Sequence, residues 1–352
     1  MIANRVFVGG ISFFSQSRGW SCDSILSYEI VLPNGRIAQI DQNNDPELFW
    51  ALHGAGSSNF GIVTSFVVDA IEVPNPKGLW LESRIYTQDK IPKLLDHLQQ
   101  VWTNDDRDLL AMNFYAFNGT QNTFAFVVSR VHTTHTNPNT LPKSIPSAQS
   151  IRSIPGTAKS EILSVGGVTA TVTQGTRGGQ CNMWLSFTYR PSRDFEAALY
   201  AIFEEEVVKL KEVKSFSAKL TTQLLPRTTT SNNGNGGFLA SASCDDNKPL
   251  VLANFGWSCK LVSDEQTVQE TAVRCLERVE ARAKEMHAWH PFKYINYADE
   301  NIQAKQVWDG FGEENVLRLK KIQKGVDPTG VFTRGGLASG YFKLNSIKAS
   351  SL

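Results

Sequence analysis

The segment DPELFWALHGAGSSNFGIVTSF, residues 45–66, constrains the fold of this chain more than any other stretch. Asp45 followed by Pro46 predicts a helix start, because aspartate caps a first helical turn and proline fits its first position. Gly54 supplies a stop for that helix, and the β-branched run over 60–73 predicts a long strand. The three glycines and two serines between helix and strand permit positive φ angles and let another group approach the backbone closely.

A second cluster of small residues, GGIS at 9–12, lies near the start of the chain. It precedes residues 24–40, where an Asn-Gly pair between two alternating runs predicts a β-hairpin. Backbone N–H groups exposed in glycine-rich turns can bind phosphate oxygens. Each cluster alone also fits an ordinary tight turn, but two of them in one α/β-like unit favour a phosphate ligand.

The middle of the chain has a different texture, which begins after Pro74 and Pro76. Apolar spacing predicts helices over 89–104, 192–213 and 264–286, and apolar runs predict strands over 109–131, 183–190 and 249–259. Two rounds of strands followed by a helix predict an antiparallel sheet with helices on one face, so the predicted fold class is α+β. The stretch 231–243, SNNGNGGFLASAS, is interpreted as flexible and polar.

The tail contains two further predicted elements. Residues 292–300, FKYINYADE, predict a short aromatic strand, and residues 312–332 predict a helix that ends at a DPTG turn.

Composition argues against several classes of protein. Lys and Arg total 35 against 34 Asp and Glu, so no general attraction to nucleic acid or to an anionic membrane is expected. No run of about 18 apolar residues is present, so no membrane span is predicted. The glycine cluster at 54–61 has no lysine and is followed by a strand, which excludes a P-loop and a Rossmann fingerprint.

Metal and disulfide sites are not predicted either. The five cysteines are odd in number and lack C-x-x-C spacing, so buried free thiols are expected. The pairs His132/His135 and His287/His290 have spacing that a metal could use, but no acid or cysteine completes either set. We expect His132 and His135 to be exposed in a polar loop and His290 to be packed.

The order of these motifs resembles the FAD-linked oxidoreductases of the berberine-bridge-enzyme-like group, within the vanillyl-alcohol-oxidase, PCMH-type FAD-binding superfamily. VGGISFFSQSRGWSCDSILSYEIVLPNGRI and DPELFWALHGAGSSNFGIVTSF look like the second half of that FAD-binding domain. YINYAD and the helix after it look like the family's C-terminal segment. The resemblance implies a partial FAD-binding domain at 1–75, a substrate domain at 76–290 and a C-terminal segment at 291–345 that returns to the FAD domain.

The resemblance also implies which residues contact FAD. The glycine-serine turn would lie against the pyrophosphate, and the GIVT strand edge would touch the adenosine half, chiefly through backbone atoms. The residues concerned are Gly9, Gly10, Ser12, Gly61, Ile62 and Val63. Asp23 would cap a turn beside the cofactor, although a satisfied turn carboxylate explains it equally well.

The catalytic residues implied by the resemblance are Tyr294 and Asn296. On a strand these two side chains share one face. Tyr294 would face the substrate and take the proton of an alcohol while hydride leaves to flavin N5, and Asn296 would lie near the flavin. Burial raises a phenol's pKa, so a cation or a hydrogen bond would have to help it act as a base. The alternative is that Tyr294 is a core aromatic residue.

One part of the family pattern has no counterpart in this sequence. The family's earlier half-domain carries a glycine-rich loop with a histidine bonded to the flavin, and a cysteine often precedes the glycine-serine turn. Cys22 follows that turn instead. Localisation therefore stays open between secretion, if a signal lies upstream of Met1, and the cytoplasm.

The expected function is FAD-dependent oxidation of a small molecule, by oxidising an alcohol or closing a ring on a secondary metabolite, with reoxidation by dioxygen. One alternative is a cofactor-free remnant that acts as a binding protein or a non-redox cyclase. Another is that a partner chain supplies the missing half-domain.

Overall fold

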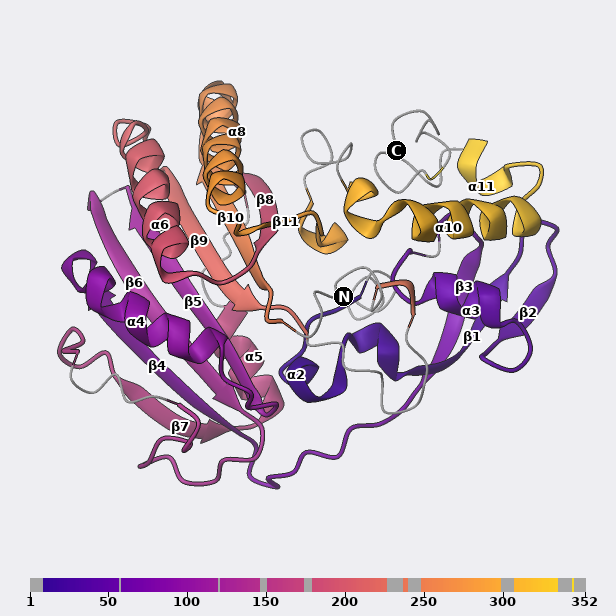
Figure 1. Ribbon diagram of the computed structural model, residues 1–352, viewed down its shortest axis with the longest axis horizontal. Coiled ribbons are helices and arrows are strands. Elements are labelled where there is room, and N and C mark those ends of the chain that lie inside the picture. Colours follow the sequence, from indigo (N-terminus) through magenta and orange to yellow (C-terminus); the bar gives the residue numbers. More distant parts are fainter. Residues whose placement is uncertain are drawn as a thin grey trace. The chain divides into compact units, whose positions relative to one another are not determined.

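The computed structural model describes residues 9–56, 58–119, 121–145, 151–173, 179–226, 237–239, 248–298, 307–334 and 344. These residues form two compact units, which are described separately (Figure 1). Unit 1 comprises Met1–Glu72, Pro226–Lys248 and Pro291–Leu352, and unit 2 comprises Val73–Leu225 and Pro249–His290. Residues 226–248 thus lie in unit 1, whereas the sequence analysis includes them in the range 76–290.

Unit 1 contains a three-stranded antiparallel sheet in the order β2-β1-β3. Its strands are β1 (Ile25–Val31), β2 (Ile37–Ile40) and β3 (Ile62–Val68). The β1–β2 hairpin is confirmed, and it turns at Gly35, whose φ is +79°. The predicted strand over 60–73 is shorter than expected.

Helix α3 (Pro46–Leu52) has the predicted start, because the N–H of Leu48 donates to the Asp45 carboxylate at 3.1 Å. The tail helix α10 (Glu313–Val326) is attached to α3 by Arg318, which pairs with Glu47 at 2.6 Å. The Arg318 guanidinium also lies 3.9 Å from the centre of the Trp50 ring. Unit 1 also contains α2 (Ser15–Arg18), η1 (Ser21–Ser24), η3 (Ile295–Tyr297), η4 (Asp309–Phe311) and α11 (Val331–Arg334).

Two predictions for the tail are wrong. Residues 292–300 form no strand in their described part, because the N–H of Tyr297 donates to the Tyr294 carbonyl and closes the 3₁₀ turn η3. The helix predicted over 312–332 ends at Val326. The Asp327 carboxylate then accepts hydrogen bonds from the N–H groups of Val331 and Phe332 and starts a new short helix.

Unit 2 is built on an eight-stranded sheet whose described strand pairs are all antiparallel. The strand order is β11-β8-β10-β9-β5-β6-β4-β7. The bounds are β4 (Leu79–Thr87), β5 (Leu109–Asn118), β6 (Thr123–His132), β7 (Lys159–Leu163), β8 (Cys181–Tyr189), β9 (Ser217–Leu224), β10 (Val251–Cys259) and β11 (Trp289–His290).

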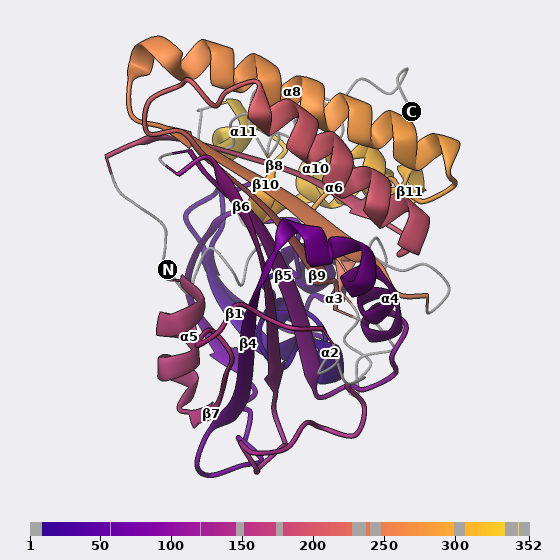
Figure 2. The same ribbon diagram turned by 90° about the vertical axis from the view of Figure 1, so that its left-hand side faces the viewer.

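Three amphipathic helices cover one face of this sheet (Figure 2). They are α4 (Ile91–Trp102), α6 (Arg193–Val208) and α8 (Val262–Glu285). The short η2 (Gln88–Lys90) precedes α4, and α5 (Val165–Thr173) lies beside β4 and β7. The predicted α+β class, with an antiparallel sheet and helices on one face, is confirmed.

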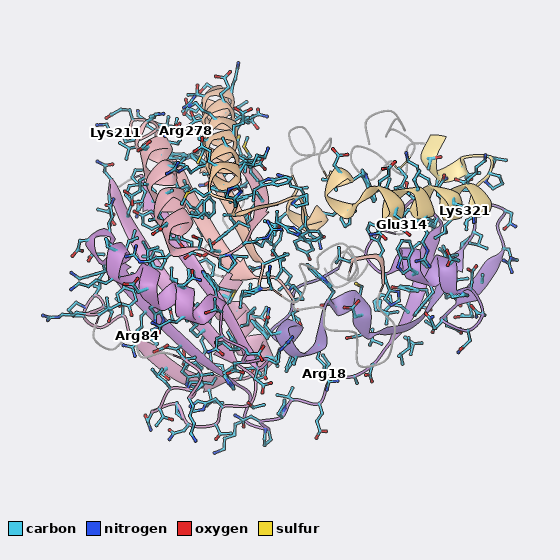
Figure 3. All side chains as sticks on the ribbon, in the orientation of Figure 1. Arg18, Arg84, Lys211, Arg278, Glu314 and Lys321 are labelled. Carbon is cyan, nitrogen blue, oxygen red and sulfur yellow. The ribbon has the colours of Figure 1, made fainter. Side chains whose placement is uncertain are left out.

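Aromatic side chains fill the space between the sheet and α6. The Tyr115 ring lies 5.6 Å from the Tyr200 ring and 5.9 Å from the Phe203 ring, and Phe203 lies 6.1 Å from Phe255. Helices α6 and α8 are joined by Glu206, which accepts from Arg274 at 2.9 Å and from Arg278, labelled in Figure 3, at 2.6 Å. These cations help hold the pKa of Glu206 down at about 2, against the opposing effect of its burial.

A polar network lies within the same core. The Glu196 carboxylate accepts hydrogen bonds from the Trp102 indole and from the Tyr189 hydroxyl at 2.8 Å. Its other oxygen, Oε2, has no hydrogen-bond partner among the described residues. Burial is the largest cause of the raised pKa of Glu196, which reaches about 7. At neutral pH the carboxyl group is therefore partly protonated.

The predictions for the histidine and cysteine side chains can be compared with the described residues. His132 is buried, contrary to the prediction, because its Nε2 lies 3.1 Å from the Asp106 carboxylate. Cys22, Cys259 and Cys275 are buried free thiols, Cys181 is partly exposed, and Cys244 lies outside the described residues.

No described group of three or more His, Cys, Asp or Glu side chains could hold a metal ion. None of the described helices is both long and apolar enough to cross a membrane.

Replacing Glu196 by Gln is expected to change how stability depends on pH. The folded-state pKa of about 7 exceeds the ordinary value of 4.5, so this group stabilises the fold at low pH and loses that contribution between pH 4.5 and 7. The loss is about 3 kcal/mol at 1.36 kcal/mol per unit. Urea unfolding from pH 4.5 to 8 should show Glu196→Gln gaining stability over the wild type by about that amount. A wild-type-to-variant difference that stays constant with pH would contradict this assignment.

Strand β3 is expected to promote self-association. It is an edge strand among the described residues, and Ile62, Val67 and Val68 are 52%, 56% and 48% exposed. Such edges pair with other chains unless a charge blocks them. We expect Val67→Lys to lower light scattering at high protein concentration. Val208→Lys, which adds the same charge to an exposed position on α6, is the matched control. Equal effects of the two variants would show that the edge is not responsible.

Candidate functional site

Three residues of the predicted site in unit 1 are joined by hydrogen bonds. The Tyr294 hydroxyl oxygen accepts from the Gly10 N–H at 2.9 Å and from the Asn296 side-chain amide at 2.8 Å. Trp20 packs beside the phenol, with ring centres 5.1 Å apart. A turn near the start of the chain and a turn near its end therefore meet at one phenolic oxygen.

The Tyr294 phenol is buried, with 2% of its surface exposed. Burial is the main cause of its raised pKa, and the bonds from Asn296 and Gly10 oppose that effect only in part. The group is therefore neutral at physiological pH. Both described hydrogen bonds are donated to its oxygen, and no described group accepts its own proton. The hydroxyl can consequently donate a hydrogen bond to a ligand.

The first glycine turn is held in a left-handed conformation. Gly9 and Gly10 have φ angles of +112° and +88°. Their carbonyls accept hydrogen bonds from the N–H groups of Cys22 and Ser21, at 2.9 and 2.8 Å, which ties the turn to η1. A Cβ at Gly9 would lie 2.4 Å from Leu239 and 3.2 Å from Tyr294. Only glycine fits this position, because both the φ angle and the close packing exclude a side chain.

The second glycine turn contacts the same leucine. Gly54 has a φ of +113°, and a Cβ there would lie 2.5 Å from the Cβ of Leu239. The Leu239 N–H donates to the His53 carbonyl at 3.2 Å. The two turns that the sequence analysis assigned to phosphate binding are therefore brought together, with Leu239 packed against both.

These residues do not form an open cradle for the FAD phosphates in this structure. Leu239, which is fully buried, fills the space beside the backbone of Gly9 and Gly54. Gly10 already donates its N–H to Tyr294. Phe238 anchors the segment by stacking on Phe311, with ring centres 4.6 Å apart. The present arrangement does not fit a bound dinucleotide, and we derive no chemical step through a flavin.

Ser12 and Asp23 have local partners. The Ser12 N–H donates to the Ser15 hydroxyl at 2.7 Å, and the Ser12 hydroxyl accepts from the Phe14 N–H at 3.2 Å. The Asp23 carboxylate accepts from the Trp20 N–H at 2.9 Å and caps η1. Burial raises the pKa of Asp23 to about 6. Asp23 thus supports the turn on which Trp20 is held against Tyr294.

Ile62 and Val63 belong to the β1–β3 ladder, and Gly61 directly precedes β3. Ile62 pairs with Val31 and Val63 pairs with Ile30. A Cβ at Gly61 would lie 2.6 Å from the Val31 carbonyl oxygen, so glycine is needed here for close strand packing. The described contacts of these residues run to β1 rather than to the Tyr294 cluster.

Sequence reasoning missed two contributors to this site. Leu239 lies in a stretch interpreted as flexible and polar, because glycines and asparagines surround a single Phe-Leu pair. His53 is buried, its Nδ1 lies 2.8 Å from the Phe49 carbonyl, and burial lowers its pKa to about 4. The Phe-Leu pair was the one signal that could have indicated the buried segment.

Comparisons with known proteins relate this chain to FAD-linked enzymes. Residues 293–334, which contain Tyr294 and Asn296, match the family model described as "Berberine and berberine like". The chain is 27% identical over 353 residues to FAD-dependent monooxygenase tpcD of Cochliobolus heterostrophus, covering 98% of this chain and 66% of that protein. The family likeness is thus shown for the C-terminal segment, and the whole chain is similar to FAD-dependent monooxygenases. It is also 27% identical to FAD-dependent monooxygenase FUP4 of Fusarium proliferatum, covering 93% of this chain and 63% of that protein.

Solved structures show the same fold. The chain superposes on 6-hydroxy-D-nicotine oxidase from Arthrobacter nicotinovorans with a TM-score of 0.70 at 19% identity, covering 93% of this chain and 69% of that one. Berberine bridge enzyme from Eschscholzia californica gives a TM-score of 0.67 at 13% identity, covering 93% and 68%. The chain spans just under two thirds of the length of tpcD and of FUP4.

Replacing either glycine that contacts Leu239 is expected to destabilise unit 1 more than an ordinary turn substitution does. Gly35 has a φ of +79°, and no atom lies within 4 Å of a Cβ added there. Gly35→Ala therefore measures the stability cost of the positive φ angle alone, about 1–2 kcal/mol. Gly54→Ala adds the 2.5 Å clash and should cost more by urea unfolding. Leu239→Gly, which removes the Cβ that the new methyl group would meet, should remove that excess in the double variant. Equal costs at Gly35 and Gly54 would rule out the described packing.

Proposed function

We propose that this protein is an FAD-dependent oxidoreductase that acts on a small molecule, with dioxygen as the electron acceptor. The observation that carries the proposal is the Gly10–Tyr294–Asn296 cluster in a chain that aligns over 98% of its length with an FAD-dependent monooxygenase. The reaction class we propose is oxidation of an alcohol or closure of a ring on a secondary metabolite. The flavin, when bound, supplies the redox chemistry.

Tyr294 is the residue we propose to handle the substrate's proton. Oxidation of an alcohol releases the proton of its hydroxyl group, and Tyr294 would accept that proton as a phenolate. The two hydrogen bonds donated to its oxygen, by Gly10 and Asn296, would stabilise the phenolate. Asn296 positions the phenol through its hydrogen bond to the Tyr294 oxygen. It does not transfer a proton, because an amide does not titrate.

FAD and Leu239 compete for the two glycine turns under this proposal. A dinucleotide phosphate needs backbone N–H groups at close range, and Leu239 now fills that space. Binding therefore requires the segment 237–239 to leave the turns. The free energy of packing a buried leucine, about 2–3 kcal/mol, would be subtracted from the affinity for FAD.

A second candidate function follows from the same contact. A chain whose glycine turns are filled by its own leucine can act without a flavin, as a small-molecule binding protein or a non-redox cyclase. A partner chain could also pair with the exposed apolar edge of β3 and contribute to the cofactor site.

Flavin titration of the wild type and of Leu239→Ala tests these alternatives. If the proposal is right, the purified chain absorbs in the flavin region or takes up added FAD, and Leu239→Ala binds FAD about tenfold or more tightly, since about 1.4 kcal/mol is tenfold in affinity. Leu239→Met, which keeps the volume of the plug, is the matched control and should bind as the wild type does. Absence of flavin uptake by the wild type and both variants would reject the oxidoreductase function and favour the cofactor-free one.

A further inference from the structure

Alternation along the strands of unit 2 assigns each side chain of the sheet to one of two faces. Tyr115 packs on Tyr200 of α6, so Phe114 points to the opposite face. Leu220 lies across from Tyr115, so its neighbours Lys219 and Thr221 also point away from the helices. We call the surface turned away from α4, α6 and α8 the far face.

A lysine lies between two aromatic rings on the far face. The Lys219 ammonium is 5.6 Å from the centre of the Phe114 ring and 5.9 Å from that of the Trp184 ring. Gly256 lies across from both Lys219 and Trp184, and a Cβ there would lie 3.3 Å from the indole. Glycine thus lets the indole lie flat over β10 beside the ammonium.

Lys219 makes no ion pair and no hydrogen bond with any described residue. Its environment is apolar enough for burial to lower the pKa of the amine, and no carboxylate contributes to that shift. The aromatic faces offset only part of the cost of desolvating the charge. An anionic group supplied by a ligand would complete the environment of this cation.

Two amides on the same face have atoms without partners. Asn254 is 5% exposed and its Oδ1 has no hydrogen-bond partner among the described residues, and the same holds for Nε2 of Gln223, which is 8% exposed. Asn254 lies across from Thr221, which places it one strand over from Lys219 and two residues along. Buried polar atoms without partners are costly unless a water or a ligand meets them.

The spacing of these groups sets the size of the ligand. Strand geometry puts the backbone positions of Lys219 and Asn254 about 8 Å apart and those of Lys219 and Gln223 about 13 Å apart. We propose that the far face binds a planar aromatic acid or phenolate of about two or three fused rings. Its anionic end would meet Lys219 between Phe114 and Trp184, and a hydroxyl or carbonyl at its other end would meet Asn254 or Gln223.

A ligand of this kind is also the substrate of the enzyme only if the proposed function holds. The binding site itself needs no flavin. Binding can therefore be measured on the flavin-free protein, so that failure of this inference and failure of the oxidoreductase proposal give different results.

The experiment compares 6-hydroxy-2-naphthoate with its methyl ester, by fluorescence titration of the full chain at neutral pH. The ester keeps the rings and the hydroxyl but removes the charge. We expect the acid to bind at least tenfold more tightly than the ester. Lys219→Met should abolish that preference and Lys219→Arg should retain it. Lys211→Met, which removes an exposed lysine labelled in Figure 3, is the control for net charge and should bind as the wild type does.

Asn254→Leu tests the opposite end of the site. It should weaken the acid and the ester by the same factor, because both keep the hydroxyl. Equal affinities of acid and ester for the wild type would overturn the inference, as would no saturable binding of either compound. An acid preference that persists in a folded Lys219→Met protein would overturn it as well, with circular dichroism reporting the fold.

Discussion

The packing of Leu239 against two glycine turns is the contact on which unit 1 depends. Gly9 and Gly54 have positive φ angles that favour glycine, and a Cβ at either position would collide with this leucine. Because Leu239 is also tied to His53 by a backbone hydrogen bond, one side chain fixes turns that lie far apart in the sequence. The glycines leave space beside the backbone that either a phosphate group or a leucine side chain can fill. Leu239 and a bound phosphate therefore exclude each other.

Unit 2 depends on a different balance, between aromatic packing and buried polar groups. Rings from the sheet and from α6 fill the layer between them, and Glu196 lies in that layer as a hydrogen-bond acceptor for Trp102 and Tyr189. The far face of the sheet combines the unpartnered atoms of Asn254 and Gln223 with a lysine held between rings. One face of the sheet is thus a closed core, and the other carries groups suited to a ligand.

Local signals predicted much of this fold from the sequence. The hairpin over 24–40, the Asp45-Pro46 helix start and the long helix α8 follow from turn chemistry, capping and apolar periodicity, which act over a few residues. Strand β9 was missed because Lys219, Thr221 and Gln223 make one of its faces polar. Residues 292–300 were predicted as a strand because aromatic residues are common in strands. In the structure the Tyr294 hydroxyl instead accepts a hydrogen bond from Gly10, which lies near the other end of the chain. A local sequence pattern cannot reveal such a distant partner.

Only part of the candidate site was predictable from the sequence, since the contacts of Gly61, Ile62 and Val63 run to β1 instead. Motif order pointed to Gly9, Gly10, Tyr294 and Asn296, and the structure brings these residues together. The role of Leu239 could not be predicted, because a Phe-Leu pair in a polar stretch gives no periodic signal, and its partners come from elsewhere in the chain.

A crystal structure of the protein grown with FAD tests the central claim most directly. We expect Leu239 to leave the two turns and the pyrophosphate to take its place beside Gly9, Gly10 and Gly54. A structure in which FAD binds elsewhere, or in which Leu239 still packs on both turns beside a bound FAD, would contradict it.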